Sequence, residues 1–283
     1  MTFWVLILLG IIQGLTEFLP ISSSGHLVLL YNIFGIDGGT VLLSIILHLA
    51  TLLSVIAYYR RDIWQLITHP LCSTNKKIIV TTLCTCVVAL VFKPLINIGF
   101  GGDFLSLFFV LTGIILWISD WINNPKDKTY NKDKTYNKDN SWVLSQIDDM
   151  STCIANLPLS YTQAVIIGLS QGIATIPGIS RSGTTIATSK ILGLDGISAK
   201  YSFLISIPII IASLLLEIIE GVHFSSINYF GLIVSFVICF AIGLLCIRLM
   251  TRMLKSSNLK YFSIYLFLLA IFLMLNSLVL HIF

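Results

Sequence analysis

The chain has 283 residues, of which 56% are hydrophobic and only 11% are charged. Soluble domains carry about 25% charged residues, and disordered chains are richer in charge and poorer in apolar residues. The composition therefore excludes disorder, and a mean hydropathy of +0.94 predicts a polytopic membrane protein. A net charge of +4 is too small to indicate a nucleic-acid partner.

The first predicted element is an apolar stretch, residues 1–34, that Gly14, Pro20 and Gly25 interrupt. Proline removes a backbone donor and ends the preceding helix, so the stretch predicts two half-helices joined by an irregular turn. Irregular backbone at membrane depth persists only where protein or water surrounds it. We therefore expect a re-entrant helical hairpin, which enters the bilayer and returns on the same side.

Charge-poor segments close to the ~20 residues of a membrane-spanning helix make up most of the remaining chain. The six predicted spans are residues 40–59, 78–98, 104–119, 201–216, 229–247 and 261–283. Lys93 and Pro94 interrupt the second of them near its end. A second broken stretch, residues 160–192, lies between the third and fourth spans and contains Gly172, Pro177, Gly178 and Gly183. The predicted fold is all-α, with about six transmembrane helices and two re-entrant hairpins.

The second broken stretch repeats the first at an interval of 158 residues. Gln13 corresponds to Gln171, and the run SSSG at 22–25 corresponds to SRSG at 180–183. Three spans follow each stretch, so we expect two repeats separated by a polar linker. The expected domains are the first repeat at 1–122, the linker at 123–158 and the second repeat at 159–283. The linker carries DKTYNK twice in tandem, which is typical of a flexible segment.

Loop charges predict the orientation of the spans. Most lysines and arginines lie in residues 60–77, 120–158 and 248–260, which we place in the cytoplasm. The opposite loops, near 98–103 and 217–228, carry acids and no basic residue. This places both termini outside and makes the two halves inverted relative to each other, an arrangement known from transporters.

The turn of the first broken stretch collects reactive side chains. Glu17 is the only charged residue before Asp37, and a carboxylate in apolar surroundings indicates function. The turn then reads PISSSGH from Pro20 to His26. One serine is explained as a helix cap, whereas three consecutive hydroxyls and an imidazole, which can exchange a proton near neutral pH, indicate a ligand site.

The turn of the second broken stretch reads PGISRSGTT from Pro177 to Thr185. Its arginine, Arg181, suits phosphate oxygens and stays charged in an apolar site, although a structural ion pair with Glu17 is the simpler reading. Hydroxyls surround it, and an inverted repeat would bring both turns together. Half-helix N-termini favour anions, so the pattern indicates a bound phosphate or diphosphate, most naturally that of a lipid.

These two motifs resemble a known family. QGLTEFLPISSSGH at 13–26 is similar to the first signature of the undecaprenyl-diphosphatase, or bacitracin-resistance, family. PGISRSGTT, preceded by Gln171 and followed by FLISIP at 203–208, is similar to the second. The resemblance covers nearly the whole chain, with the tandem linker as an insertion. It implies an enzyme of the bacterial inner membrane that hydrolyses a C55 polyprenyl diphosphate to the monophosphate and inorganic phosphate. This reaction recycles the carrier lipid of cell-wall synthesis and confers bacitracin resistance.

The motifs also supply the candidate site residues. The resemblance implies catalytic roles for Glu17, Ser23, His26 and Arg181. The expected phosphate-binding residues are Gln13, Ser22, Ser24, Gln171, Ser180, Ser182 and Thr185. His48 lies within a predicted span. The sequence supports two roles for it equally: it lines the site, or it is a polar core residue.

The chain departs from the family pattern at two positions. Gln13 offers no carboxylate at the first place of the acidic motif, and Ser44 stands where the family often has an acid. The resemblance implies stimulation by a divalent cation, Mg or Ca, but the sequence shows no dedicated metal ligands. It does not determine the oligomeric state, and a homodimer is compatible with it.

The expected mechanism is attack of Ser23 on phosphorus, with Glu17 or His26 as the base and Arg181 stabilising the phosphoryl charge. His26 can alternatively protonate the leaving oxygen or activate water, and water can attack directly while Ser23 only binds phosphate. A different class, a lipid flippase or transporter, uses the same inverted-repeat architecture. The acid-phosphatase-like lipid phosphatases are disfavoured, because their pattern needs a histidine where Ala187 stands.

Overall fold

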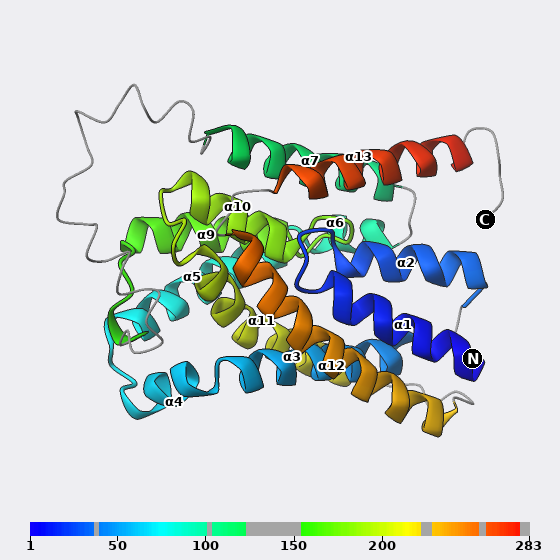
Figure 1. Ribbon diagram of the computed structural model, residues 1–283, viewed down its shortest axis with the longest axis horizontal. Helices are drawn as coiled ribbons and strands as arrows, with labels where there is room; N and C mark the ends of the chain where they lie inside the picture. Colours follow the sequence, from blue (N-terminus) through cyan, green and yellow to red (C-terminus); the bar gives the residue numbers. More distant parts are fainter. Residues whose placement is uncertain (37–39, 101–103, 123–153, 222–227, 255–258, 278–283) are drawn as a thin grey trace.

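The computed structural model describes residues 1–36, 40–100, 104–122, 154–221, 228–254 and 259–277, and every regular element among them is helical (Figure 1). The first half contains α1 (Phe3–Thr16), α2 (Ser23–Phe34), α3 (Thr40–Tyr58), α4 (Arg60–Thr68), α5 (Ser73–Val91), α6 (Lys93–Phe100) and α7 (Leu105–Ile122). After a short 3-10 helix, η2 (Ile154–Asn156), come α9 (Tyr161–Ile173), α10 (Arg181–Ile191), α11 (Ser198–Glu220), α12 (Tyr229–Met253) and α13 (Lys260–Leu275).

Five of these helices are long and apolar enough to cross a membrane: α3, α5, α7, α11 and α12. The prediction of an all-α polytopic membrane protein is therefore confirmed. Large apolar side chains such as Leu90, Ile219 and Leu268 are exposed on the helix surfaces, as lipid contact requires. Helix α13, of 16 residues, begins at Lys260 and follows the sixth predicted span as far as Leu275. The tandem part of the predicted linker lies outside the described residues.

One predicted boundary was wrong. The outer loop was expected to begin near residue 217, but α11 continues to Glu220, so Glu217 lies in a helix. The flanking residues Leu216 and Ile218 are apolar, and they allow the helix to extend past one isolated acid. The predicted span 78–98 is interrupted where Lys93 and Pro94 indicate, because α5 ends at Val91 and α6 begins two residues later, with Pro94 in its first turn.

Both broken stretches form a helix, a turn and a second helix, as the prolines predict. Pro20 lies between α1 and α2, and Pro177 lies between α9 and α10. A serine caps the second helix of each pair: Ser22 Oγ accepts from the Gly25 N–H at 3.3 Å, and Ser180 Oγ accepts from the Gly183 N–H at 3.0 Å. The caps satisfy backbone donors that a helix start leaves unpaired.

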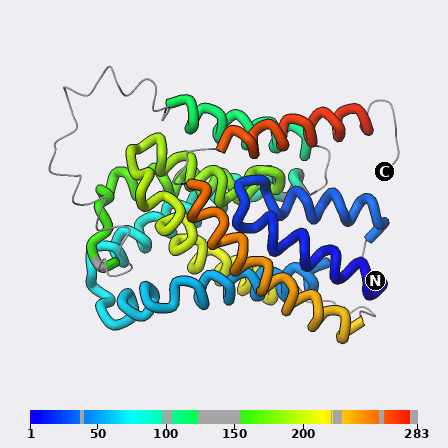
Figure 2. The backbone as a smooth tube through the Cα atoms, in the orientation of Figure 1, coloured from blue at the N-terminus to red at the C-terminus, as the bar shows by residue number. Residues whose placement is uncertain are grey.

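The first helix of each broken stretch packs against a helix of the other half. Helix α1 lies on α12, where the Ser235 hydroxyl donates to the Leu6 carbonyl at 2.7 Å. Helix α9 lies on α5, where the Thr81 hydroxyl donates to the Ala164 carbonyl at 3.0 Å. Figure 2 shows α7 and α13 running alongside each other at one side of the bundle. The two turns therefore lie within the bundle, between helices of both halves.

Candidate active site

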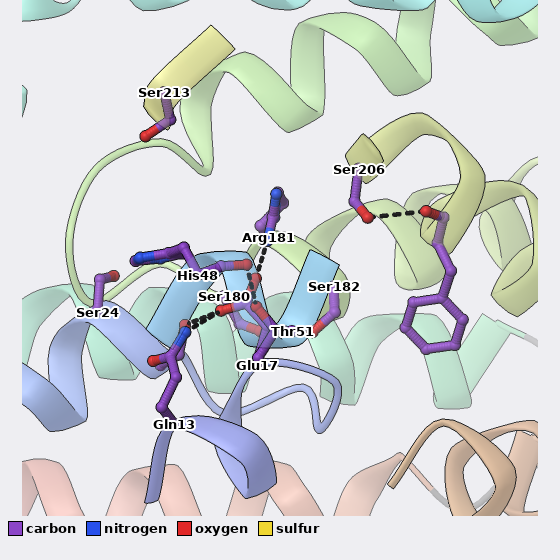
Figure 3. Close-up of polar contacts among 12 residues, drawn as sticks. Gln13, Glu17, Ser24, His48, Thr51, Ser180, Arg181, Ser182, Ser206 and Ser213 are labelled. Atoms are coloured by element: carbon purple, nitrogen blue, oxygen red, sulfur yellow. Dashed lines mark hydrogen bonds and ion pairs between the residues drawn. The ribbon is translucent and has the colours of Figure 1, made fainter. Parts of the chain in front are cut away.

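Glu17, directly after α1, is the centre of the candidate site. Its carboxylate is buried and accepts three hydrogen bonds. Oε2 accepts from the Ser23 hydroxyl at 2.5 Å and from the Gln13 amide at 3.1 Å. Oε1 pairs with Arg181 Nη2, and Figure 3 shows Gln13 and Arg181 approaching the carboxylate from different sides. Hydrogen bonds to its charged form stabilise the ionised carboxylate in this apolar environment.

The backbone of the first turn is strained at Ser22. Its φ is +69°, and it is the one non-glycine residue with positive φ among the described residues. Such a conformation costs about 1–3 kcal/mol and persists only where surrounding contacts enforce it. Ser22 is both the cap of α2 and the residue before Ser23, so this conformation sets the direction of the Ser23 side chain.

Two hydrogen bonds fix the imidazole of His26. Nδ1 lies 2.7 Å from the Ser22 carbonyl oxygen, and Nε2 lies 2.7 Å from the Tyr265 hydroxyl of α13. The Phe109 ring packs edge-on against the imidazole, with ring centroids 5.4 Å apart. Neither ring nitrogen is therefore directed at the Ser23 hydroxyl, whose partner is Glu17.

The second turn supplies the positive charge. Ser180 caps α10, and Arg181 begins that helix half-buried beside Glu17. The Ser182 hydroxyl donates to the Leu19 carbonyl of the first turn at 3.1 Å. Thr185 lies one helical turn further on, and its hydroxyl is 2.5 Å from that of Ser202 in α11.

Glycines allow the two turns to approach closely. A Cβ on Gly25 would lie 2.7 Å from the Phe109 ring and 3.0 Å from the Gly178 Cα. A Cβ on Gly183 would lie 3.1 Å from Pro20. A pocket opens where the turns meet α11, and its lining consists of Glu17, Phe18, Arg181, Ser182, Ser202, Phe203 and Ser206. The pocket thus combines one carboxylate, one guanidinium and several hydroxyls.

Most of the predicted site residues come together, but two lie elsewhere. Gln13, Glu17, Ser23 and Arg181 form one hydrogen-bonded group, and Ser22 and Ser24 share the first turn, with hydroxyls 3.5 Å apart. Gln171 instead donates to the Thr85 hydroxyl of α5 at 3.0 Å.

His48 belongs to a separate polar group on α3 and α11. Its Nδ1 lies 2.9 Å from the Ser44 carbonyl oxygen and 3.1 Å from the Ser44 hydroxyl. The Ser44 hydroxyl in turn donates to Glu217 at 3.4 Å. Figure 3 draws His48 together with the residues around Glu17 and Arg181.

Several residues near the site carried no signal in the sequence. Tyr265, Ser202 and Ser206 lie in predicted spans, where a single hydroxyl is ordinary. Lys190 is almost fully buried and pairs with Asp120 at 2.9 Å, although the Lys and Arg pattern assigned it no partner. Only the packing of α7, α10 and α13 brings these residues into contact.

The donor set does not fit a bound divalent cation. Among the described residues, no three His, Cys, Asp or Glu side chains gather as a metal-binding group. The carboxylate at the pocket, Glu17, is already bound by Arg181, Gln13 and Ser23. Divalent cations such as Mg²⁺ and Ca²⁺ are normally bound by several carboxylates or other oxygen ligands. The proposed mechanism therefore relies on side chains of this chain.

The fold and the site together define a polytopic helical membrane protein with a polar pocket that contains one carboxylate, one guanidinium and several hydroxyls. The family described as "Bacitracin resistance protein BacA" matches residues 6–272, and the chain belongs to this family.

Three relatives have comparable length. An undecaprenyl-diphosphatase from Christiangramia forsetii is 35% identical over 275 residues, covering 92% of this chain and 93% of the relative. One from Thermosipho melanesiensis is 35% identical over 274 residues, covering 94% and 96%. One from Methanococcus maripaludis is 34% identical over 277 residues, covering 95% and 98%.

Proposed function

We propose that this protein is an undecaprenyl-diphosphatase of the cell membrane. It hydrolyses the diphosphate of the C55 carrier lipid to the monophosphate and inorganic phosphate, and so returns the carrier to cell-wall synthesis. Family membership and full-length relatives of that name support this function. The observation that carries it is the group of Ser23, Glu17 and Arg181, in which a nucleophile, a base and a phosphate ligand meet.

Glu17 is the base in the proposed mechanism. The Ser23 hydroxyl already donates to Glu17 Oε2 at 2.5 Å, so the proton has an acceptor as Oγ attacks the terminal phosphorus. The P–O bond to the lipid phosphate breaks, and that phosphate leaves while Ser23 carries the phosphoryl group. Water then releases inorganic phosphate from Ser23. Of the two bases considered from the sequence, His26 is disfavoured because both ring nitrogens have other partners.

The second turn binds the substrate phosphate in this proposal. Arg181 exchanges part of its contact with Glu17 for the terminal phosphoryl oxygens, whose charge a guanidinium fork stabilises in the transition state. Ser182 lines the pocket beside it. The N-termini of α2 and α10 add positive potential. Gln13 keeps the carboxylate oriented toward Ser23.

Phosphate release by purified protein in detergent tests the activity, because transport has no meaning there. We expect release from undecaprenyl diphosphate, and acid quenching during turnover should trap phosphoserine at Ser23. Ser23→Ala should lower kcat about 10³-fold. Substantial turnover by Ser23→Ala, without trapped phosphoserine, would instead support direct attack by water. No release by the wild type would contradict the proposed function.

The proposal includes two inverted repeats with re-entrant hairpins. It is supported by the packing of the first helix of each hairpin against the other half of the chain: α1 lies on α12, and α9 lies on α5. The hydrogen bonds to Leu6 and Ala164, 158 residues apart in sequence, recur at equivalent points of these contacts. The N-terminus and the end of α13 lie at the same end of the molecule, opposite α4, which agrees with both termini outside (Figure 1). Labelling of single cysteines introduced at Thr2 and Arg61, from each side of the membrane, tests this topology.

A further inference from the structure

Tyr265, in the last helix of the chain, contacts the imidazole beside the proposed nucleophile. Its hydroxyl oxygen lies 2.7 Å from His26 Nε2, although the two residues are 239 positions apart in sequence. The two rings are nearly parallel, at 9°, with centroids 5.8 Å apart. The Tyr265 hydroxyl is therefore within hydrogen-bond distance of a ring nitrogen, and the two rings are aligned.

The partners of His26 assign its proton. The Ser22 carbonyl oxygen can only accept a hydrogen bond, so Nδ1, at 2.7 Å, carries the proton. In the neutral ring Nε2 then accepts, and the Tyr265 hydroxyl donates to it. A hydrogen bond on one ring nitrogen fixes which nitrogen carries the proton. The Ser22 carbonyl thus selects the tautomer, and the Tyr265 hydroxyl completes it by donating to Nε2, which holds the imidazole in this orientation.

That carbonyl belongs to the strained residue of the turn. Ser22 has φ +69°, and surrounding contacts must enforce this conformation. The His26 bond to its carbonyl is one such contact, and the bond of the Gly25 N–H to its side chain is another. Since Ser23 follows directly, the same conformation keeps the Ser23 hydroxyl 2.5 Å from Glu17.

The helix that carries Tyr265 is itself anchored. Asp120 at the end of α7 accepts from the Lys260 backbone N–H at 2.7 Å and pairs with Lys190 of α10 at 2.9 Å. The start of α13 is therefore fixed to both α7 and α10. This anchor fixes the position of Tyr265, which lies about one turn further along α13, beside His26.

We propose that Tyr265 is a positioning residue for the nucleophile turn, acting through His26 and the Ser22 carbonyl on Ser23. The proposal rests on the proposed function, because it assigns the tyrosine a part in setting up the attack. It also makes His26 primarily an orienting group rather than the base.

The test compares Tyr265→Phe with Tyr261→Phe in the full-length protein in detergent. Tyr261 lies one turn earlier on α13, and its side chain is 59% exposed, so it is a matched control. Losing one hydrogen bond should lower kcat about fivefold and leave KM within about twofold. In a His26→Gln background, Tyr265→Phe should lower kcat by less than about twofold further, because the tyrosine acts only through that imidazole.

A spectroscopic measurement does not depend on activity. In protein with ¹⁵N-labelled histidine, the signals that His26→Gln removes should show a protonated Nδ1 and a hydrogen-bonded, unprotonated Nε2. Tyr265→Phe should shift the Nε2 signal, and Tyr261→Phe should not.

The proposal is overturned by unchanged His26 signals, by an unchanged kcat, by an equal loss in Tyr261→Phe, or by full additivity with His26→Gln. If the wild type released no phosphate, the proposed function would fail separately. The ¹⁵N signals would then still decide whether Tyr265 orients His26.

Discussion

The two turns at the centre of the molecule share a helix-capping pattern and differ in chemistry. In each, a serine caps a helix that begins beside a proline turn: Ser22 for α2 and Ser180 for α10. The first turn holds the carboxylate and the serine hydroxyl bound to it, whereas the second holds the arginine. At the position equivalent to Ser23, the second turn has Arg181.

The difference shows how the two copies of one motif carry different chemical groups. Glu17 corresponds to Thr175, and Thr175 donates only to the Gly172 carbonyl of its own turn, at 2.6 Å. With no carboxylate there, Gln171 turns to Thr85, while Gln13 binds Glu17. In the proposed mechanism one turn reacts and the other holds phosphate, and the following variants test that division.

Removing the carboxylate should have the largest effect. We expect Glu17→Gln to lower kcat by about 10⁴-fold, because it removes the base and the charge that orders Arg181. The equivalent change in the other turn, Thr175→Val, should leave kcat within about threefold. Phosphate release from undecaprenyl diphosphate measures both, and equal losses would contradict the division of tasks.

Removing the arginine should be nearly as severe. Arg181→Ala should lower kcat/KM about 10³-fold, since the fork that stabilises the phosphoryl charge is lost. Arg181→Lys should recover only part of the lost kcat/KM, because a single ammonium cannot bind two oxygens in the same way. Lys200→Ala is the control, as Lys200 pairs with Asp62 at 2.8 Å, away from the pocket. Full activity of Arg181→Ala would show that phosphate binds elsewhere.

An added methyl group where the two turns meet should destabilise the protein more on the first turn than on the second. Gly25→Ala would place Cβ 2.7 Å from the Phe109 ring, and overpacking of this kind costs about 1–3 kcal/mol in the free energy of unfolding. The closest atom to a Cβ on Gly183 is the Ser180 hydroxyl at 3.0 Å, so Gly183→Ala should cost less. Thermal unfolding in detergent compares the two variants. A larger loss for Gly183→Ala would mean that the turns meet differently.

Substitutions of the two glutamines should show the smallest difference in kcat/KM. Gln13→Ala removes one hydrogen bond to Glu17 and should lower kcat/KM about fivefold. Gln171→Ala removes a bond to Thr85 and should lower the thermal midpoint while kcat/KM stays within about twofold. Kinetics and melting of the same preparations separate these effects. A kinetic loss confined to Gln171→Ala would reverse the assignment.

Local patterns predicted the helices and the interruptions well, because apolar length and proline positions act within one segment. The breaks at Pro20 and Pro177 and the serine caps follow them. The predicted end of α11 was wrong. One acid, Glu217, resembles a loop residue in sequence but is accommodated in this helix, where Ser213 of the same helix and Ser44 of α3 donate to it.

The sequence by itself determined the class of protein, the two broken helices and the scarce charges, Glu17 and Arg181, on which the site depends. Only the tertiary structure decided which groups touch. It placed Ser23 rather than His26 on the carboxylate, turned Gln171 away, and brought Tyr265 across 239 residues to the imidazole. The physical reason is that helix formation and breaking depend on neighbours in the chain, whereas these contacts depend on how separate helices pack.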